Sequence, residues 1–153
     1  MQLRLIAVDK IRTPYVVDAC AEFRNRLKTY APYEEIEVRA GAGNDPERAM
    51  ADEAARVLRL VRPDDRIWLL ERTGTELSSE ELSIKISGAA QNALSRLTFV
   101  VSGTFGAATV LHERADFLWS LSRLTFLHEW ARMLVLEQLY RSAKIARNEP
   151  YHH

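Results

Sequence analysis

Five short apolar runs, separated by stretches with helical spacing, most constrain what this chain can fold into. The longest occupy residues 2–8 (QLRLIAV), 66–71 (RIWLLE) and 97–103 (LTFVVSG). Nearly continuous apolar runs of this length are typical of strands buried on both faces of a parallel sheet. Shorter candidate strands occupy residues 117–121 and residues 33–39, the latter alternating like an edge strand. The alternation predicts an α/β fold, a mainly parallel sheet with helices on both faces.

The segments between these strands carry helix start signals. Thr13-Pro14 and Asp45-Pro46 each pair a capping side chain with a proline in the first turn. Ser78 or Ser79 precedes two glutamates that suit a helix N-terminus. The predicted helices cover residues 13–29, 46–61, 79–93, 107–115 and 127–147. No repeat or long linker divides the chain, so residues 1–153 are predicted to form a single domain.

Composition excludes some classes of protein. With 47% hydrophobic and 27% charged residues, the chain is typical of a soluble globular protein, and no apolar run is long enough to span a bilayer. The formal net charge is zero, which does not indicate a strongly basic nucleic-acid binder. From Arg123 onward, five basic residues against three glutamates give a mild cationic bias toward a phosphate-rich partner.

Cysteine and histidine usage sets further expectations. The single cysteine, Cys20, excludes an intrachain disulfide and, without a signal-peptide pattern, indicates a cytoplasmic location. Cys20 lies on an apolar helical face, which predicts a packed core thiol. The histidines have no cysteine partners and no H-E-x-x-H spacing, so no metal site is predicted.

Three loops are the candidate ligand-binding loops, because ligands of open parallel sheets bind beyond the carboxyl ends of the strands. They follow Glu71, Val101 and Leu121, and the first includes Thr73-Gly74-Thr75, predicted as a loop. The second lies in VVSGTFGAA (100–108), where glycines let the backbone approach a ligand and a helix offers free N–H groups. This segment is neither GxGxxG nor a P-loop, so a plain strand-to-helix turn is an equal alternative.

The last third of the chain is the most unusual part. LSRLTF (121–126) predicts a loop that presents backbone polar groups within an apolar wall, which suits an adenine edge. The helix beyond is apolar nearly all round, which predicts burial inside the domain or at a subunit interface, and we favour an isologous dimer. Glu137 and Arg141 form either a surface ion pair worth roughly 0.3–0.5 kcal/mol or a support for an arginine aimed at substrate. The closing Tyr151-His152-His153 is either a frayed end, with His153 a tag remnant, or a functional tail.

Together these segments resemble a known family. SGTFG, LSRLTFLHEWAR, EQLYRSAKI and NEPYHH, with LRLIAV and IWLLE, are similar to the RlmH (YbeA) type of SPOUT-class RNA methyltransferases over essentially the whole chain. The resemblance implies a homodimeric SPOUT-type α/β protein with a deep C-terminal trefoil knot, an exception to the rule that chains do not knot. It also implies methyl transfer from S-adenosylmethionine to N3 of a pseudouridine in large-subunit ribosomal RNA, on the ribosome.

The resemblance also implies site residues. The cofactor positions are Leu70, Ser102, Gly103, Gly106, Leu121, Ser122, Arg123, Leu124, Thr125 and Phe126. Arg141, Tyr151 and His152 fall on the substrate side, where the tail of one subunit would cover the neighbouring cofactor pocket. His152 would accept the imide proton, Arg141 would stabilise negative charge or hold a phosphate, and Tyr151 would stack on the base.

The chain departs from the family pattern at two positions that border the cofactor site. Ser102 stands where the family has glycine, and Leu127 stands where it has proline. The alternative function is therefore a knotted ribosome- or RNA-binding protein of the same fold with weak or absent catalysis.

Overall fold

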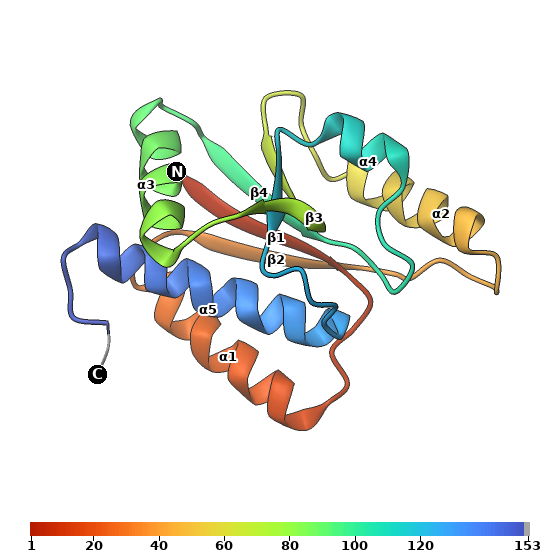
Figure 1. Ribbon diagram of the computed structural model, residues 1–153, viewed down its shortest axis with the longest axis horizontal. Helices are drawn as coiled ribbons and strands as arrows, with labels where there is room; N and C mark the ends of the chain where they lie inside the picture. Colours follow the sequence, from red (N-terminus) through yellow and green to blue (C-terminus); the bar gives the residue numbers. More distant parts are fainter. Residues whose placement is uncertain (152–153) are drawn as a thin grey trace.

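The computed structural model describes residues 1–151, in which five strands alternate with five helices (Figure 1). The elements are β1 (Gln2–Val8), α1 (Pro14–Lys28), β2 (Tyr33–Val38), α2 (Pro46–Leu58), β3 (Arg66–Glu76), α3 (Ser79–Gln91), β4 (Arg96–Val101), α4 (Thr109–Arg114), β5 (Phe117–Ser120) and α5 (His128–Ala146). Every element predicted from the sequence is present, with ends shifted by a few residues. In this described part, no helix combines the length and the apolar character that crossing a bilayer requires.

The sheet is parallel throughout, in the order β2-β1-β4-β3-β5. The predicted α/β fold with a mainly parallel sheet is confirmed, and β2 forms an edge as its alternating pattern indicated. Because β4, β3 and β5 are neighbours, the loops that follow them emerge side by side at one edge of the sheet. The C-terminal trefoil knot is not tested by strand order or register, and it stays a prediction.

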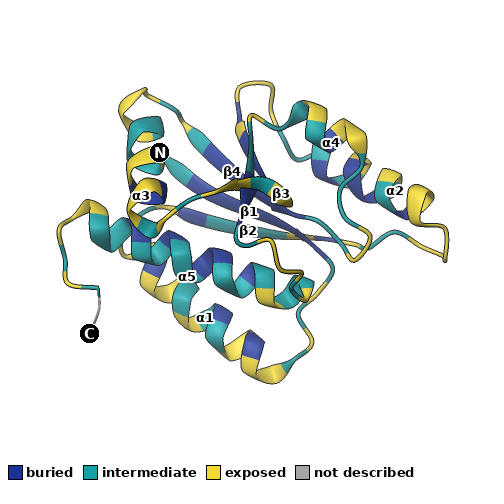
Figure 2. Cartoon of the chain, in the orientation of Figure 1, coloured by how far each residue is buried: buried dark blue, intermediate teal, exposed yellow. Residues whose placement is uncertain are grey.

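The core has two sides because successive strand residues face opposite ways. In β1, Leu5 and Ala7 pack with residues of α1, α3 and α5, whereas Ile6 and Val8 pack with residues of α2 and α4. Figure 1 shows these helices on the two faces, and Figure 2 shows the strands between them as the most deeply buried part of the chain. The helices therefore cover both faces, as predicted, which explains the nearly continuous apolar runs.

Cys20 belongs to this core. It is 1% exposed, and burial raises the pKa of its thiol to about 11. A thiol with such a pKa is almost entirely protonated at neutral pH, and the thiolate is the nucleophilic form. The predicted packed core thiol is confirmed.

The prediction of a loop at Thr73-Gly74-Thr75 is wrong, because β3 continues through this segment to Glu76. Leu70 and Thr75 both lie opposite Trp119 of β5, with an irregularity of the pairing between them. A Cβ atom on Gly74 would lie 2.6 Å from the carbonyl oxygen of Leu118, so only glycine fits there. Glycine in a strand often marks such a bulge or close approach, and in the sequence it looks the same as a turn.

Buried charges join α5 to the other end of the chain. Arg132 of α5, 3% exposed, forms ion pairs with Glu35 and, at 2.8 Å, with Glu37, both on β2. Arg24 of α1 reaches the other carboxylate oxygen of Glu35 at 2.8 Å. Burial alone would raise the pKa of Glu35, but the hydrogen bonds and charges of the two arginines together outweigh it and lower that pKa. Glu35 is therefore ionised in the folded protein at neutral pH and holds the first helix and the last helix onto the edge strand.

Candidate active site

A cavity of about 600 Å³ lies at the carboxyl ends of β3, β4 and β5. Its walls come from residues 70–72, 101–107 and 121–128 without Arg123, together with Trp119 and Ala131. These stretches contain parts of all three loops that the sequence indicated. The strand order explains the convergence, because β4, β3 and β5 are neighbours and end at the same edge.

Nine of the ten predicted cofactor residues line this cavity: Leu70, Ser102, Gly103, Gly106, Leu121, Ser122, Leu124, Thr125 and Phe126. Arg123 does not. Its side chain is 91% exposed and lies 3.7 Å from the carboxylate of Glu76. The structure thus brings the predicted set together around one space, and their contact with a cofactor stays a prediction.

The two glycines of the turn, Gly103 and Gly106, are explained by different structural constraints. Gly106 has a φ of +88°, a left-handed conformation that side chains disfavour, and its N–H donates to the carbonyl of Gly103 at 3.0 Å. A Cβ atom on Gly103 would lie 2.7 Å from Oε2 of Glu53. Gly103 is therefore required by a buried carboxylate behind the turn. The approach of a ligand, proposed from sequence, is not needed to explain it.

Two polar atoms of the lining residues support a polar ligand in the cavity. Ser102 Oγ and His128 Nε2 are buried and have no hydrogen-bond partner within residues 1–151. Buried polar atoms are nearly always paired, so such orphans call for an explanation, and a bound molecule is one. Trp119, Leu121 and Phe126 add apolar wall suited to a flat heteroaromatic ring. The residues present therefore fit a nucleoside-containing cofactor.

Glu71 is a further polar group on the cavity wall. Its carboxylate lies 2.9 Å from Nε2 of His112 on α4, whose Nδ1 lies 3.2 Å from the carbonyl oxygen of Ala108. A carbonyl and a carboxylate both only accept, so both contacts are hydrogen bonds when each ring nitrogen carries a proton. The imidazole therefore braces Glu71 against the helix that follows the glycine turn. The sequence pointed to the loop after Glu71 and not to this side chain.

Arg141 and Tyr151 lie together at the other end of α5. Arg141 Nη2 lies 2.6 Å from Glu137 Oε1, and the guanidinium carbon lies 3.4 Å from the centre of the Tyr151 ring. The Tyr151 hydroxyl donates to the same Glu137 oxygen. Burial, followed by this hydrogen bond, raises the pKa of Tyr151 to about 12. The predicted Glu137–Arg141 pair is thus a partly buried arrangement with an aromatic cover, rather than a freely exposed surface pair.

Two of the three predicted substrate-side residues, Arg141 and Tyr151, do not line the cavity of the same chain. Arg141 lies ten residues beyond Ala131, the last cavity residue of α5, which corresponds to about 15 Å along the helix axis. Neither Arg141 nor Tyr151 lines the cavity, and Figure 1 shows the C-terminal segment leaving the far end of α5. The third predicted residue, His152, lies outside the described residues, as does His153.

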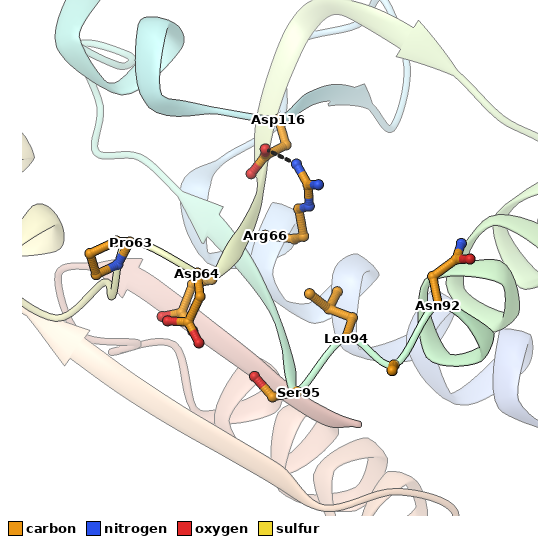
Figure 3. A pocket seen from close by; sticks show the side chains of 9 residues that line it. Pro63, Asp64, Arg66, Asn92, Leu94, Ser95 and Asp116 are labelled. Carbon is orange, nitrogen blue, oxygen red and sulfur yellow. Dashed lines mark hydrogen bonds and ion pairs between the residues drawn. The ribbon is translucent and has the colours of Figure 1, made fainter.

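A second cavity, of about 380 Å³, lies near the amino ends of β3, β4 and β5 (Figure 3). Two of its charged side chains pair with each other, since Asp116 accepts from Arg66 at 2.6 Å, and Asp116 also accepts from the Ile67 N–H at 2.8 Å. Side chains that are already paired in this way offer a ligand few free charged or hydrogen-bonding atoms. Over residues 1–151, no group of three or more His, Cys, Asp or Glu side chains is placed to hold a metal ion.

Comparison with known proteins gives a consistent result. The family model described as "Predicted SPOUT methyltransferase" matches residues 1–152. Proteins named ribosomal RNA large subunit methyltransferase H are similar over the full length. The one from Solidesulfovibrio magneticus is 41% identical, with 99% of this chain and 98% of the relative covered. The one from Geobacter sulfurreducens is 38% identical, with all of both chains covered. The one from Gloeobacter violaceus is 37% identical, with 100% of this chain and 99% of the relative covered.

Proposed function

The chain belongs to the SPOUT methyltransferase family, and from this premise we propose that it methylates large-subunit ribosomal RNA with S-adenosylmethionine as methyl donor. The family resemblance found in the sequence is confirmed, and the protein is a methyltransferase. One observation carries the proposal to this molecule: three loops distant in sequence enclose one cavity, and two of its lining residues, Ser102 and His128, carry buried polar atoms that have no partner within residues 1–151.

The residues of the cavity suit the parts of S-adenosylmethionine. The apolar side chains and the backbone of residues 121–126 would hold the adenine, and the glycine turn would hold the remainder. The Ser102 hydroxyl is buried and has no partner within residues 1–151, so a rotation of this side chain toward the cavity would let it hydrogen-bond the cofactor. The bound cofactor supplies an electrophilic methyl group.

The proposed acceptor is N3 of a pseudouridine, whose imide proton must leave. Tyr151 has a pKa of about 12 and donates its proton to Glu137, so it would be a poor base at neutral pH. This leaves His152 as the base among the three predicted residues. Glu137 and the Tyr151 ring hold the Arg141 guanidinium in place to stabilise a developing anion.

We propose that the active unit is a homodimer. Arg141 and Tyr151 are too far from the cavity of their own chain, so a second copy would have to supply them. Large apolar side chains exposed around the cavity mouth, namely Phe105, Leu124, Leu127 and Trp130, give such a copy a surface to cover. The ribosome is the proposed partner, which places the protein in the cytoplasm, and no metal is proposed.

The function is tested by incubating the protein with ribosomes and methyl-labelled S-adenosylmethionine, then mapping the label. Incorporation into large-subunit RNA at the N3 position of one pseudouridine is expected, and protein-free ribosomes are the control. Removal of residues 151–153 should abolish incorporation while leaving calorimetric binding of S-adenosylmethionine intact. Ribosome binding with no incorporation by the full chain would instead favour the non-catalytic alternative.

A further inference from the structure

A smaller cavity of about 200 Å³ lies behind the glycine turn. We call it the Glu53 cavity, after the carboxylate of α2 that lines it. It shares four lining residues with the large cavity: Gly103, Thr104, Phe105 and His128. Its remaining walls are the carboxyl end of β1 and residues 40–41. The two spaces are thus separated by little more than the glycine turn.

Glu53 is a nearly buried carboxylate without a compensating cation. Glu53 is only 6% exposed, and its Oε1 accepts a hydrogen bond from the Gly41 N–H at 2.9 Å. Within residues 1–151 no basic side chain forms an ion pair with it, whereas Asp9 in the same cavity is paired with Arg12 at 2.9 Å. Burial of an unpaired carboxylate is costly, so the position favours a ligand that brings a positive charge.

The carboxylate faces the turn closely. Glu53 Oε2 would lie only 2.7 Å from a Cβ atom on Gly103, so the carboxylate packs directly against the backbone of the turn. His128, whose Nε2 is buried and has no partner within residues 1–151, lines both cavities. The two cavities therefore meet at the glycine turn and His128, which brings Glu53 next to the wall of the large cavity.

We propose that the Glu53 cavity binds the α-ammonium group of the methionine part of S-adenosylmethionine, with Glu53 as its acceptor. This inference rests on the proposed function. A primary ammonium has three donors and a compact charge, and a carboxylate in a space of this size matches both. The space is too small for the adenosine part, which the larger apolar cavity suits better.

The test is calorimetric binding of three ligands to the full chain and to Glu53→Gln. S-adenosylmethionine carries the sulfonium and the ammonium, S-adenosylhomocysteine carries the ammonium alone, and 5′-methylthioadenosine carries neither. Glutamine keeps an oxygen for the Gly41 N–H, and a thermal unfolding curve checks that the variant is folded. Asp52→Asn, the neighbouring carboxylate on the same helix, is the matched control.

Glu53→Gln is expected to weaken binding of the two ammonium-bearing ligands by about 10- to 100-fold and to leave 5′-methylthioadenosine within about two-fold. Equal weakening of all three ligands would mean that Glu53 acts by shaping the turn, which overturns the proposal. If Glu53→Gln weakens binding of S-adenosylmethionine alone, the carboxylate faces the sulfonium and the proposal is overturned. If the variant binds all three ligands as well as the unsubstituted chain does, Glu53 takes no part in binding and the proposal is likewise overturned. If the unsubstituted chain binds none of the three, the proposed function itself fails, before any variant is compared.

Discussion

Individual residues around the glycine turn constrain one another sterically, and Gly103 is the clearest case. A methyl group there would meet the carboxylate of Glu53, which is buried and held by the Gly41 N–H. Gly103→Ala is expected to lower the free energy of unfolding by about 1–2 kcal/mol, measured by urea denaturation.

A double-mutant cycle identifies the cause. In a Glu53→Ala background the cost of Gly103→Ala should shrink markedly, because the colliding oxygens are gone. Gly106→Ala is the control: no atom lies within 4 Å of its Cβ position, so its cost comes from the positive φ and should be the same in both backgrounds. An unchanged cost of Gly103→Ala would show that the collision is relieved in some other way.

A substitution of Arg141 tests the role of its contacts with Glu137 and Tyr151 near the C-terminal end of α5. Arg141→Lys keeps the charge but loses the planar stack on Tyr151 and the paired N–H groups toward Glu137. The turnover rate is expected to fall by roughly 10- to 100-fold, with binding of S-adenosylmethionine unchanged. Arg147→Lys, which alters an arginine over the Tyr30 ring one turn and a half further along, should leave the rate unchanged. A comparable loss in both variants would argue for a general effect on the helix end.

The sequence predicted some site residues and missed others, for reasons visible in single side chains. The turn that contains Ser102 and Gly106 was predicted to face a ligand because a strand, a glycine turn and a helix follow one another directly in the chain. Both residues do line the cavity, and their contact with a cofactor stays a prediction. Glu53 was missed because the group that it faces, Gly103, lies fifty residues further along. A charged side chain on an amphipathic helix is normally solvent-exposed, and nothing local marks this one as buried.

At the scale of elements, α1, β2 and α5 are joined through Glu35, and this connection is pH-dependent. The pKa of Glu35 is lowered in the folded state, so its contribution is complete above the ordinary carboxyl pKa of 4.5 and is lost as the pH falls below that value. Glu35→Gln is expected to cost about 3 kcal/mol at pH 7, because two arginines lose their buried partner. The difference in free energy of unfolding between the two proteins should become smaller as the pH is lowered below 4.5, because the unsubstituted chain is then also losing the ion pair.

Urea denaturation of both proteins between neutral and acid pH measures this difference. Glu47→Gln, an exposed carboxylate of α2, should follow the unsubstituted chain at every pH. A constant gap between Glu35→Gln and the unsubstituted chain across the acid range would contradict a lowered pKa for Glu35.

The order of strands and helices was predictable because each element carries its own periodicity, and α1, α2 and α3 also begin at a proline or at a capping side chain. The continuation of β3 through Gly74 was not, since the close approach that requires this glycine is made by Leu118 of β5. The parallel pairing and the coverage of both faces followed from the apolar runs. The order of the strands in the sheet, β2-β1-β4-β3-β5, depends on contacts between segments distant in sequence, which no local sequence pattern indicates.

At the scale of the whole molecule, the separation of the cavity from Arg141 makes a prediction about mixed dimers. A cavity-blocking Ser102→Phe chain and an Arg141→Ala chain should each be inactive alone. If each site combines the cavity of one subunit with the tail of the other, mixed dimers contain one intact site and one doubly impaired site. Random mixing should then restore about a quarter of the activity of the unsubstituted protein.

The measurement is methyl incorporation before and after the two variants are denatured and refolded together. Two copies of the same variant refolded together are the control and should stay inactive. Absence of any recovery, with mixed dimers demonstrated by native mass spectrometry, would mean that the cavity and the tail of one chain serve the same site.

The contact between α1 and α5 bears on how the protein is made. Glu129 of α5 accepts the N–H groups of Arg12 and Thr13, and the two helices share one side of the core. The first helix therefore has no complete surface to pack on until the last one exists. During synthesis the segment that becomes α5 is still enclosed by the ribosome when most of the chain has emerged. Contacts between sequence-distant segments form slowly, so part of the apolar side of α1 stays uncovered until the segment of α5 has emerged and packed. The newborn chain is thus exposed to aggregation and proteolysis through this side of α1 until then.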